Sequence, residues 1–212
     1  MPEPRVLILF IFSALILLVT PGPAVLFIVT RTLQQGRSAG LASVLGLCCG
    51  GLVHVAAAVF GLSALLAASA TAFTIVKFLG AAYLIFLGIK TLFSAYHSPD
   101  KVATPSRSSR QLFIDGFIVN VFNPKTAIFF LAFLPQFVYP LESGSVRTQL
   151  AVLGFVFLFL ALITDSLYSI MASSFRSWLV RKPRVLRYQR YFSASVYFGL
   201  GLATAFSGRK ND

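Results

Sequence analysis

The stretch Thr20-Pro21-Gly22-Pro23 lies inside an apolar run that extends from Val6 to Val29. A proline within a helix removes one backbone N–H, and its ring clashes with the carbonyl four residues earlier. This stretch therefore predicts that a helix over the run is interrupted. Backbone groups that are freed inside a lipid bilayer must find partners within the protein, so such a break is tolerated mainly where it lines a cavity.

The composition indicates an integral membrane protein. Of the 212 residues, 57% are hydrophobic and only 11% are charged, whereas a soluble domain carries about 25% charged residues. The net charge of +12 does not indicate a nucleic-acid partner, because the basic residues fall between the apolar runs. The adjacent Cys48 and Cys49 are interpreted as packing residues, since metal sites and disulfides favour wider spacings.

Six apolar runs are predicted to cross the membrane as helices. A crossing requires about 20 residues, which the first five runs reach, and the sixth is the shortest. The predicted spans are Val6–Val29, Gly40–Leu66, Ala72–Phe93, Leu112–Val138, Gln149–Ala172 and Tyr191–Phe206. The first is interpreted as a retained span, because no A-x-A-like cleavage site follows it. A polar loop is expected over Arg31–Ser38, between the first two spans.

The distribution of Lys and Arg predicts the topology. Twelve of the 18 lie in the loops that follow spans 1, 3 and 5, and four lie in the other loops and the termini. Basic loops face the cytoplasm. We therefore expect both termini outside the cytoplasm, in the periplasm if the membrane is a bacterial inner membrane.

The fourth span is also interrupted, at Asn123-Pro124-Lys125. Residues 10–23 align with residues 113–126 without a gap, which superimposes the two breaks. We therefore expect an all-α membrane protein built as two inverted three-helix repeats, residues 1–95 and 112–212, joined by a cytoplasmic linker at 96–111. Paired interruptions in the two halves of a transporter mark its binding site.

The half-helices that resume after Pro23 and Pro124 carry positive dipole ends, which favour an anionic group such as a carboxylate. The alternative is a pair of kinks that serve only packing. The predicted substrate-binding residues are Thr20, Pro21, Gly22, Pro23, Asn123, Pro124, Lys125, Asp165 and Tyr83.

Three ionisable residues within the spans have alternative interpretations. A charge at membrane depth is costly and therefore needs a role or a partner. Lys125 either attracts a substrate carboxylate or forms a structural ion pair. Asp165 neutralises Lys125, binds a substrate ammonium or carries a proton. His54 relays protons or is a packing histidine. Gly46 and Gly50 form a G-x-x-x-G pattern, which is interpreted as a helix-packing site.

No P-loop, H-E-x-x-H or G-x-S-x-G motif is present, so neither an ATP motor nor an enzyme is predicted. No cofactor and no metal site are expected.

The chain resembles the LysE/RhtB family of amino-acid exporters. The resemblance rests on Thr20-Pro21-Gly22-Pro23, on Gly61-Leu62-Ser63-Ala64 in the second span, on Gly80-Ala81-Ala82-Tyr83 in the third and on Asn123-Pro124-Lys125. It implies a six-helix carrier of the inner membrane that exports amino acids or their derivatives in exchange for protons. The alternatives are a carrier of another small solute or of a metal ion, and a membrane-embedded enzyme or assembly factor. The expected partners are an amino-acid substrate, the lipid bilayer and, as an open alternative, further copies of the chain.

Overall fold

The computed structural model describes residues 3–62, 107–138 and 145–174 continuously, and single residues or pairs between 71 and 89 and between 191 and 202. Every regular element with described bounds is a helix. This confirms the prediction of an all-α protein. Most of the predicted third and sixth spans, including Tyr83, lies outside the described residues.

The first predicted span consists of two helices. Helix α1 (Pro4–Val19) ends at Val19 with Thr20 as its C-cap, and α2 (Pro23–Gln35) follows at a bend of 51°. Pro23 occupies the first turn of α2, where its missing N–H costs no hydrogen bond. The predicted interruption of this span is therefore confirmed.

The fourth predicted span is interrupted in the same way. Helix α6 (Ser109–Val121) is followed at a bend of 44° by α7 (Pro124–Ile128), which continues as the π-helical turn η2 (Phe129–Phe133) and the 3₁₀ turn η3 (Leu134–Phe137). Pro124 starts α7 as Pro23 starts α2. Both breaks thus lie at the prolines that predicted them.

The second and fifth spans are long helices. Helix α3 (Arg37–Ala56) continues into the π-helical turn η1 (Ala57–Leu62), and α8 runs from Val146 to Ser174. The described residues contain two helices long and apolar enough to cross a membrane, or up to four if each bent pair counts as one span.

The polar loop predicted over Arg31–Ser38 is wrong. Helix α2 extends to Gln35 and α3 begins at Arg37, so only Gly36 separates them. Gly36 has φ of 90°, a left-handed conformation that glycine adopts without a steric penalty. A single residue therefore reverses the chain, and the polar residues become the ends of two helices.

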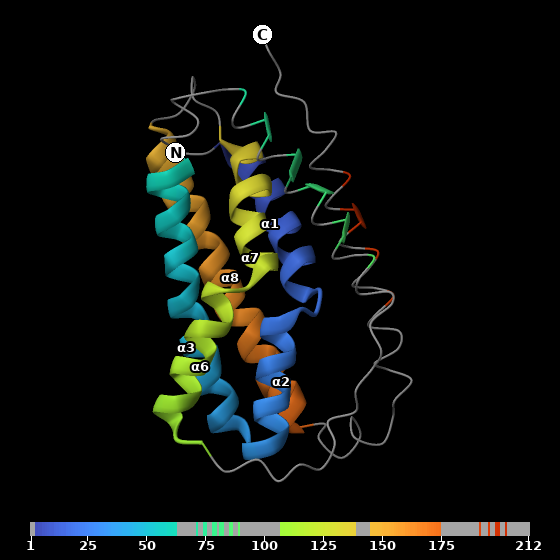
Figure 1. Cartoon of the computed structure of the whole chain (residues 1–212), viewed down its shortest axis with the longest axis vertical. Coiled ribbons are helices and arrows are strands. Elements are labelled where there is room, and N and C mark those ends of the chain that lie inside the picture. Colours follow the sequence, from blue (N-terminus) through green and yellow to red (C-terminus); the bar gives the residue numbers. More distant parts are fainter. Residues whose placement is uncertain are drawn as a thin grey trace.

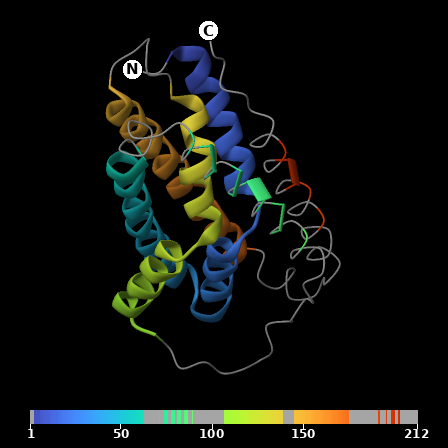
Figure 2. The ribbon, with the colours of Figure 1, turned by 45° about the horizontal axis from the view of Figure 1, so that its top comes forward.

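The two bent spans run in opposite chain directions through the bundle (Figure 1, Figure 2). At one end the ring of Phe10 in α1 lies 5.3 Å from the ring of Phe137 in η3. At the other end Arg31 of α2 lies 3.7 Å from Asp115 of α6. The breaks are therefore brought to the same depth of the bundle, between these two contacts.

Glycines allow α3 and α6 to pack against each other with their backbones in contact. A Cβ atom at Gly46 would meet the backbone of Phe113, and one at Gly50 would lie 2.6 Å from the carbonyl oxygen of Phe117. From the other side, a Cβ at Gly116 would meet the backbone of Ser43. The packing interpretation of the G-x-x-x-G pattern is thus confirmed.

Candidate functional site

The end of α1 leaves backbone carbonyls without helical partners, as the end of any helix does. Within the chain segment itself, the hydroxyl of Thr20 donates to Ile16 O at 2.7 Å and the backbone N–H of Thr20 donates to Leu17 O at 3.0 Å. Two other helices supply the remaining donors. The hydroxyl of Tyr168 in α8 donates to Val19 O at 2.6 Å, and the ammonium of Lys125 in α7 donates to Thr20 O.

The end of α6 is capped from α3. His54 Nε2 lies 2.8 Å from the carbonyl oxygen of Asn120. Because a carbonyl only accepts hydrogen bonds, this contact assigns the proton to Nε2. The His54 ring also stacks on Phe130 with ring centroids 6.0 Å apart. His54 thus holds the interrupted end of α6 in place.

The side chain of Asn120 joins three helices at the second break. Its amide nitrogen donates to Leu47 O of α3 at 2.6 Å, and its amide oxygen accepts from the hydroxyl of Thr126 in α7 at 3.1 Å. The side-chain amide nitrogen of Asn123 also lies 3.5 Å from that amide oxygen of Asn120. Asn120 therefore fixes α7 relative to α3 and α6.

The two resuming half-helices differ at their first turns. The side chain of Asn123 accepts a hydrogen bond from the backbone N–H of Lys125 at 3.1 Å, so an amide already caps α7. At α2 the N-cap residue is Gly22, and no side chain caps this end. Gly22, Ala24 and Val25 of this first turn line a pocket. The dipole of α2 therefore presents its positive end to that pocket.

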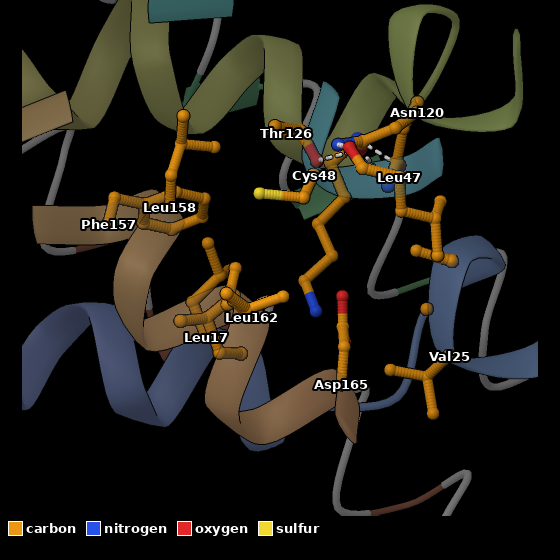
Figure 3. A pocket seen from close by; sticks show the side chains of 16 residues that line it. Leu17, Val25, Leu47, Cys48, Asn120, Thr126, Phe157, Leu158, Leu162 and Asp165 are labelled. Atoms are coloured by element: carbon orange, nitrogen blue, oxygen red, sulfur yellow. Dashed lines mark hydrogen bonds between the residues drawn. The ribbon is translucent and has the colours of Figure 1, made fainter. Parts of the chain in front are cut away.

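A cavity of about 40 Å³ lies between the two breaks (Figure 3). Its polar lining residues are Cys48, Asn120, Asn123, Lys125, Thr126 and Asp165, and its other lining residues are Leu17, Leu18, Gly22, Ala24, Val25, Leu47, Phe157, Leu158, Ala161 and Leu162. In Figure 3, Asn120 and Thr126 lie at the top and Asp165 at the bottom, while Phe157, Leu158, Leu17 and Leu162 gather on the left.

Lys125 and Asp165 bring opposite charges into this cavity. Their side chains are buried, with 7% and 9% of their surfaces exposed, and their charges act on each other. A charged group at membrane depth is expensive unless it faces a partner or a polar cavity. The pocket supplies both, and it holds one basic and one acidic side chain among its lining residues.

The predicted site residues are distributed over the pocket and the breaks that surround it. Gly22, Asn123, Lys125 and Asp165 line the cavity. Four others belong to the breaks but are not among its lining residues: Thr20, Pro21, Pro23 and Pro124. His54 is likewise absent from the lining, and Tyr83 lies outside the described residues.

Three residues of the site and its breaks were not predicted from the sequence, namely Asn120, Thr126 and Tyr168, and Cys48 was assigned to packing alone. Asn120 and Thr126 lie within three residues of Asn123, so polar residues next to a proline break in an apolar run were a usable signal. The contact of Tyr168 with Val19 joins residues that are 149 positions apart. Nothing local in the sequence marks that contact.

A cluster of ion pairs closes the bundle end at which α2 finishes and α6 begins. Asp115 accepts a hydrogen bond from Arg107 and lies 3.7 Å from Arg31. The backbone N–H of Arg107 also donates to the Gln35 side chain at 2.9 Å. The segment around Gly36 and the segment that precedes α6 therefore lie at the same end of the bundle. This agrees with the prediction that the basic loops after spans 1 and 3 face the same side of the membrane.

Comparisons with known proteins identify relatives along most of the chain. A family model described as "LysE type translocator" matches residues 15–208. An uncharacterized membrane protein, YrhP of Bacillus subtilis, is 28% identical over 95% of this chain and 99% of its own length. A homoserine/homoserine lactone efflux protein of Salmonella typhimurium is 27% identical over 92% of this chain and 94% of its own. A leucine efflux protein of Salmonella choleraesuis is 28% identical over 61% of each chain. No solved structure matches.

Proposed function

Because this chain belongs to the LysE type translocator family, we propose that it exports amino acids or their derivatives across the bacterial inner membrane in exchange for protons. Relatives named as efflux proteins for homoserine, homoserine lactone and leucine support an amino-acid substrate. The observation that carries the proposal is the pocket at the two helix breaks, which combines an acid, a base and the start of a helix that no side chain caps.

The pocket is complementary to a zwitterion. The substrate carboxylate binds at the first turn of α2, where Gly22, Ala24 and Val25 face the cavity and the helix dipole favours negative charge. Lys125 contributes its positive charge from α7. The substrate ammonium binds Asp165, whose carboxylate enters the pocket from α8 (Figure 3).

The cavity is too small for an amino acid in this conformation. Its volume of about 40 Å³ corresponds to a few water molecules, since one water needs roughly 10–15 Å³ by this measure. Substrate binding therefore requires the half-helices to separate. The breaks at Thr20–Gly22 and Phe122–Asn123 are the points at which the half-helices can rotate with the least loss of helical hydrogen bonds.

The arrangement of the described helices supports two inverted repeats, residues 1–95 and 112–212. The bent spans run in opposite directions, and each is capped by the long helix of the other proposed repeat. His54 of α3 caps α6, and Tyr168 of α8 caps α1. Alternating access in such carriers is a rocking of one repeat against the other. The charge distribution of the loops supports termini on the periplasmic side.

We assign the coupling proton to Asp165 and keep His54 as the second candidate. Asp165 lines the pocket, so proton and substrate ammonium compete for one carboxylate, and this competition couples antiport. The Nε2 proton of His54 is engaged by the Asn120 carbonyl, and its ring stacks on Phe130. His54 would therefore relay protons only after leaving this carbonyl.

The test is accumulation of labelled amino acids in everted membrane vesicles that contain the chain and are energised to acidify their interior. We expect uptake of at least one amino acid, and we expect a protonophore to abolish it. Vesicles that accumulate none of the twenty amino acids, nor homoserine or its lactone, would refute the proposal. Uptake that persists in the protonophore would refute proton coupling alone.

A further inference from the structure

Apolar side chains of α1 and α8 gather on one side of the pocket. Leu17 of α1 and Phe157 and Leu158 of α8 form this apolar wall, with exposed fractions of 1%, 3% and 5%. Leu162 completes it one helical turn after Leu158. Figure 3 shows these four side chains together, opposite Asn120 and Thr126. The wall thus adjoins Asp165, which follows Leu162 by three residues on α8, and lies across the pocket from Asn120 and Thr126.

The wall offers no hydrogen-bond partner to a substrate side chain. Its side chains are leucine and phenylalanine, which carry neither donors nor acceptors. The backbone of α8 behind them is helical, so its polar groups are engaged in the helix. A hydroxyl placed against this wall would lose its hydrogen bonds to water without replacement, which is unfavourable.

A cationic substrate side chain is disfavoured more strongly. Asp165 is the acidic residue among those that line the pocket, and in the proposed binding mode it faces the α-ammonium. A second positive charge on the substrate would then lie against the apolar wall beside Lys125. Both burial of an unpaired charge and repulsion between like charges oppose this arrangement.

We infer that the wall formed by Leu17, Phe157, Leu158 and Leu162 makes the carrier selective for amino acids with apolar side chains, such as leucine and methionine, over hydroxylated and cationic ones. This inference rests on the proposed function. An apolar pocket typically discriminates by about 10–200-fold between two substrates that differ by one methylene group. A preference for leucine over homoserine of at least about tenfold is therefore expected, and a larger one over lysine.

The test measures binding rather than transport. The full chain in lipid nanodiscs is equilibrated separately with labelled L-leucine, L-methionine, L-homoserine and L-lysine, and the dissociation constants are compared. Tighter binding of leucine and methionine by about tenfold or more supports the inference. Equal or tighter binding of homoserine or lysine overturns it and leaves the proposed function intact. Binding of none of the four overturns the inference, and the vesicle assay then decides separately whether the proposed function stands.

A matched pair of variants assigns the preference to the wall. Leu162→Ser places a hydroxyl on the wall and should lower the ratio of leucine to homoserine affinity by about tenfold. Ile163→Ser makes a similar change at the next position of α8, which is 43% exposed and does not line the pocket, and should leave the ratio unchanged. Because the readout is a ratio, a general loss of stability does not move it. An unchanged ratio in Leu162→Ser would refute the role of the wall.

Discussion

Replacing Lys125 with methionine should abolish export, and the structure shows two separate reasons. Methionine keeps the length of the side chain but removes the ammonium. Asp165 then lies 9% exposed in the pocket without the opposite charge of Lys125. The carbonyl of Thr20 also loses the hydrogen bond that Lys125 donates. The complementary change, Asp165→Asn, removes the opposite charge but leaves the contact between Lys125 and Thr20 intact.

The two effects differ in size. Lys125 and Asp165 are buried and their charges act on each other. Removing one of two such charges costs up to about 3–5 kcal/mol, the value for a buried ion pair, because the other charge is left uncompensated. The lost bond to Thr20 leaves a buried acceptor unsatisfied, which costs about 1–3 kcal/mol more. If Lys125 and Asp165 only neutralise each other, the double variant avoids the cost of an uncompensated charge but keeps the cost of the lost hydrogen bond to Thr20. If both contact the substrate or the proton, the double variant inserts into the membrane but stays inactive, and we expect this second result.

The assay is export of a labelled amino acid from cells that express each single variant and the double variant, with the membrane abundance of each measured. Arg110→Met is the matched control, because Arg110 is exposed and its charge lies outside the pocket. We expect the control to export normally. Normal export by either single variant would remove that residue from the site. Recovery of export in the double variant would refute our reasoning and leave the pair a structural role.

Three further predictions concern the packing and the topology. Gly46→Leu should lower membrane abundance, since overpacking costs about 1–3 kcal/mol. Gly61→Ala should not, because no atom of the described residues lies within 4 Å of the added carbon. Equal abundance of the two variants would contradict the packing of α3 against α6. Asp115→Asn should shift the melting temperature by only a few degrees, since partly exposed ion pairs contribute about 0–1 kcal/mol, and a large shift would show that the cluster contributes more. An alkaline phosphatase fused after Asp212 should be active; an inactive fusion beside an active cytoplasmic reporter would overturn the topology.

The breaks were predictable because their cause is local. Proline has no backbone N–H, and its ring clashes with the carbonyl four residues earlier. Pro23 and Pro124 therefore determine where the helices resume, independently of the surrounding residues. The burial of Lys125 and Asp165 was predictable for a similar reason, since charged residues within apolar runs must face the interior. The loop over Arg31–Ser38 was mispredicted because its polarity suggested a loop, while a single glycine sufficed for the turn.

The partners that stabilise the breaks could not be predicted, because they come from distant parts of the chain. His54 reaches Asn120 across 66 positions, and Tyr168 reaches Val19 across 149. In the sequence, His54 and Tyr168 are simply polar-tipped residues within apolar runs. Which carbonyl each side chain reaches depends on how the helices pack, and in particular on the close approach of α3 to α6 that the glycines allow.

These long-range contacts also explain how an interrupted helix is stable inside a membrane. A carbonyl without a partner at a break would cost several kcal/mol in lipid. Tyr168 and Lys125 each donate to one at the end of α1, and His54 adds a donor to the Asn120 carbonyl, which also accepts the backbone N–H of Asn123. The donors for α1 come from α7 and α8, and the side-chain donor for α6 comes from α3. Any rocking of one proposed repeat against the other therefore stretches these same bonds. If the repeats rock as proposed, the groups that stabilise the breaks are the ones that exchange partners when the pocket opens, and in the proposed function Lys125 makes that exchange with a substrate carboxylate.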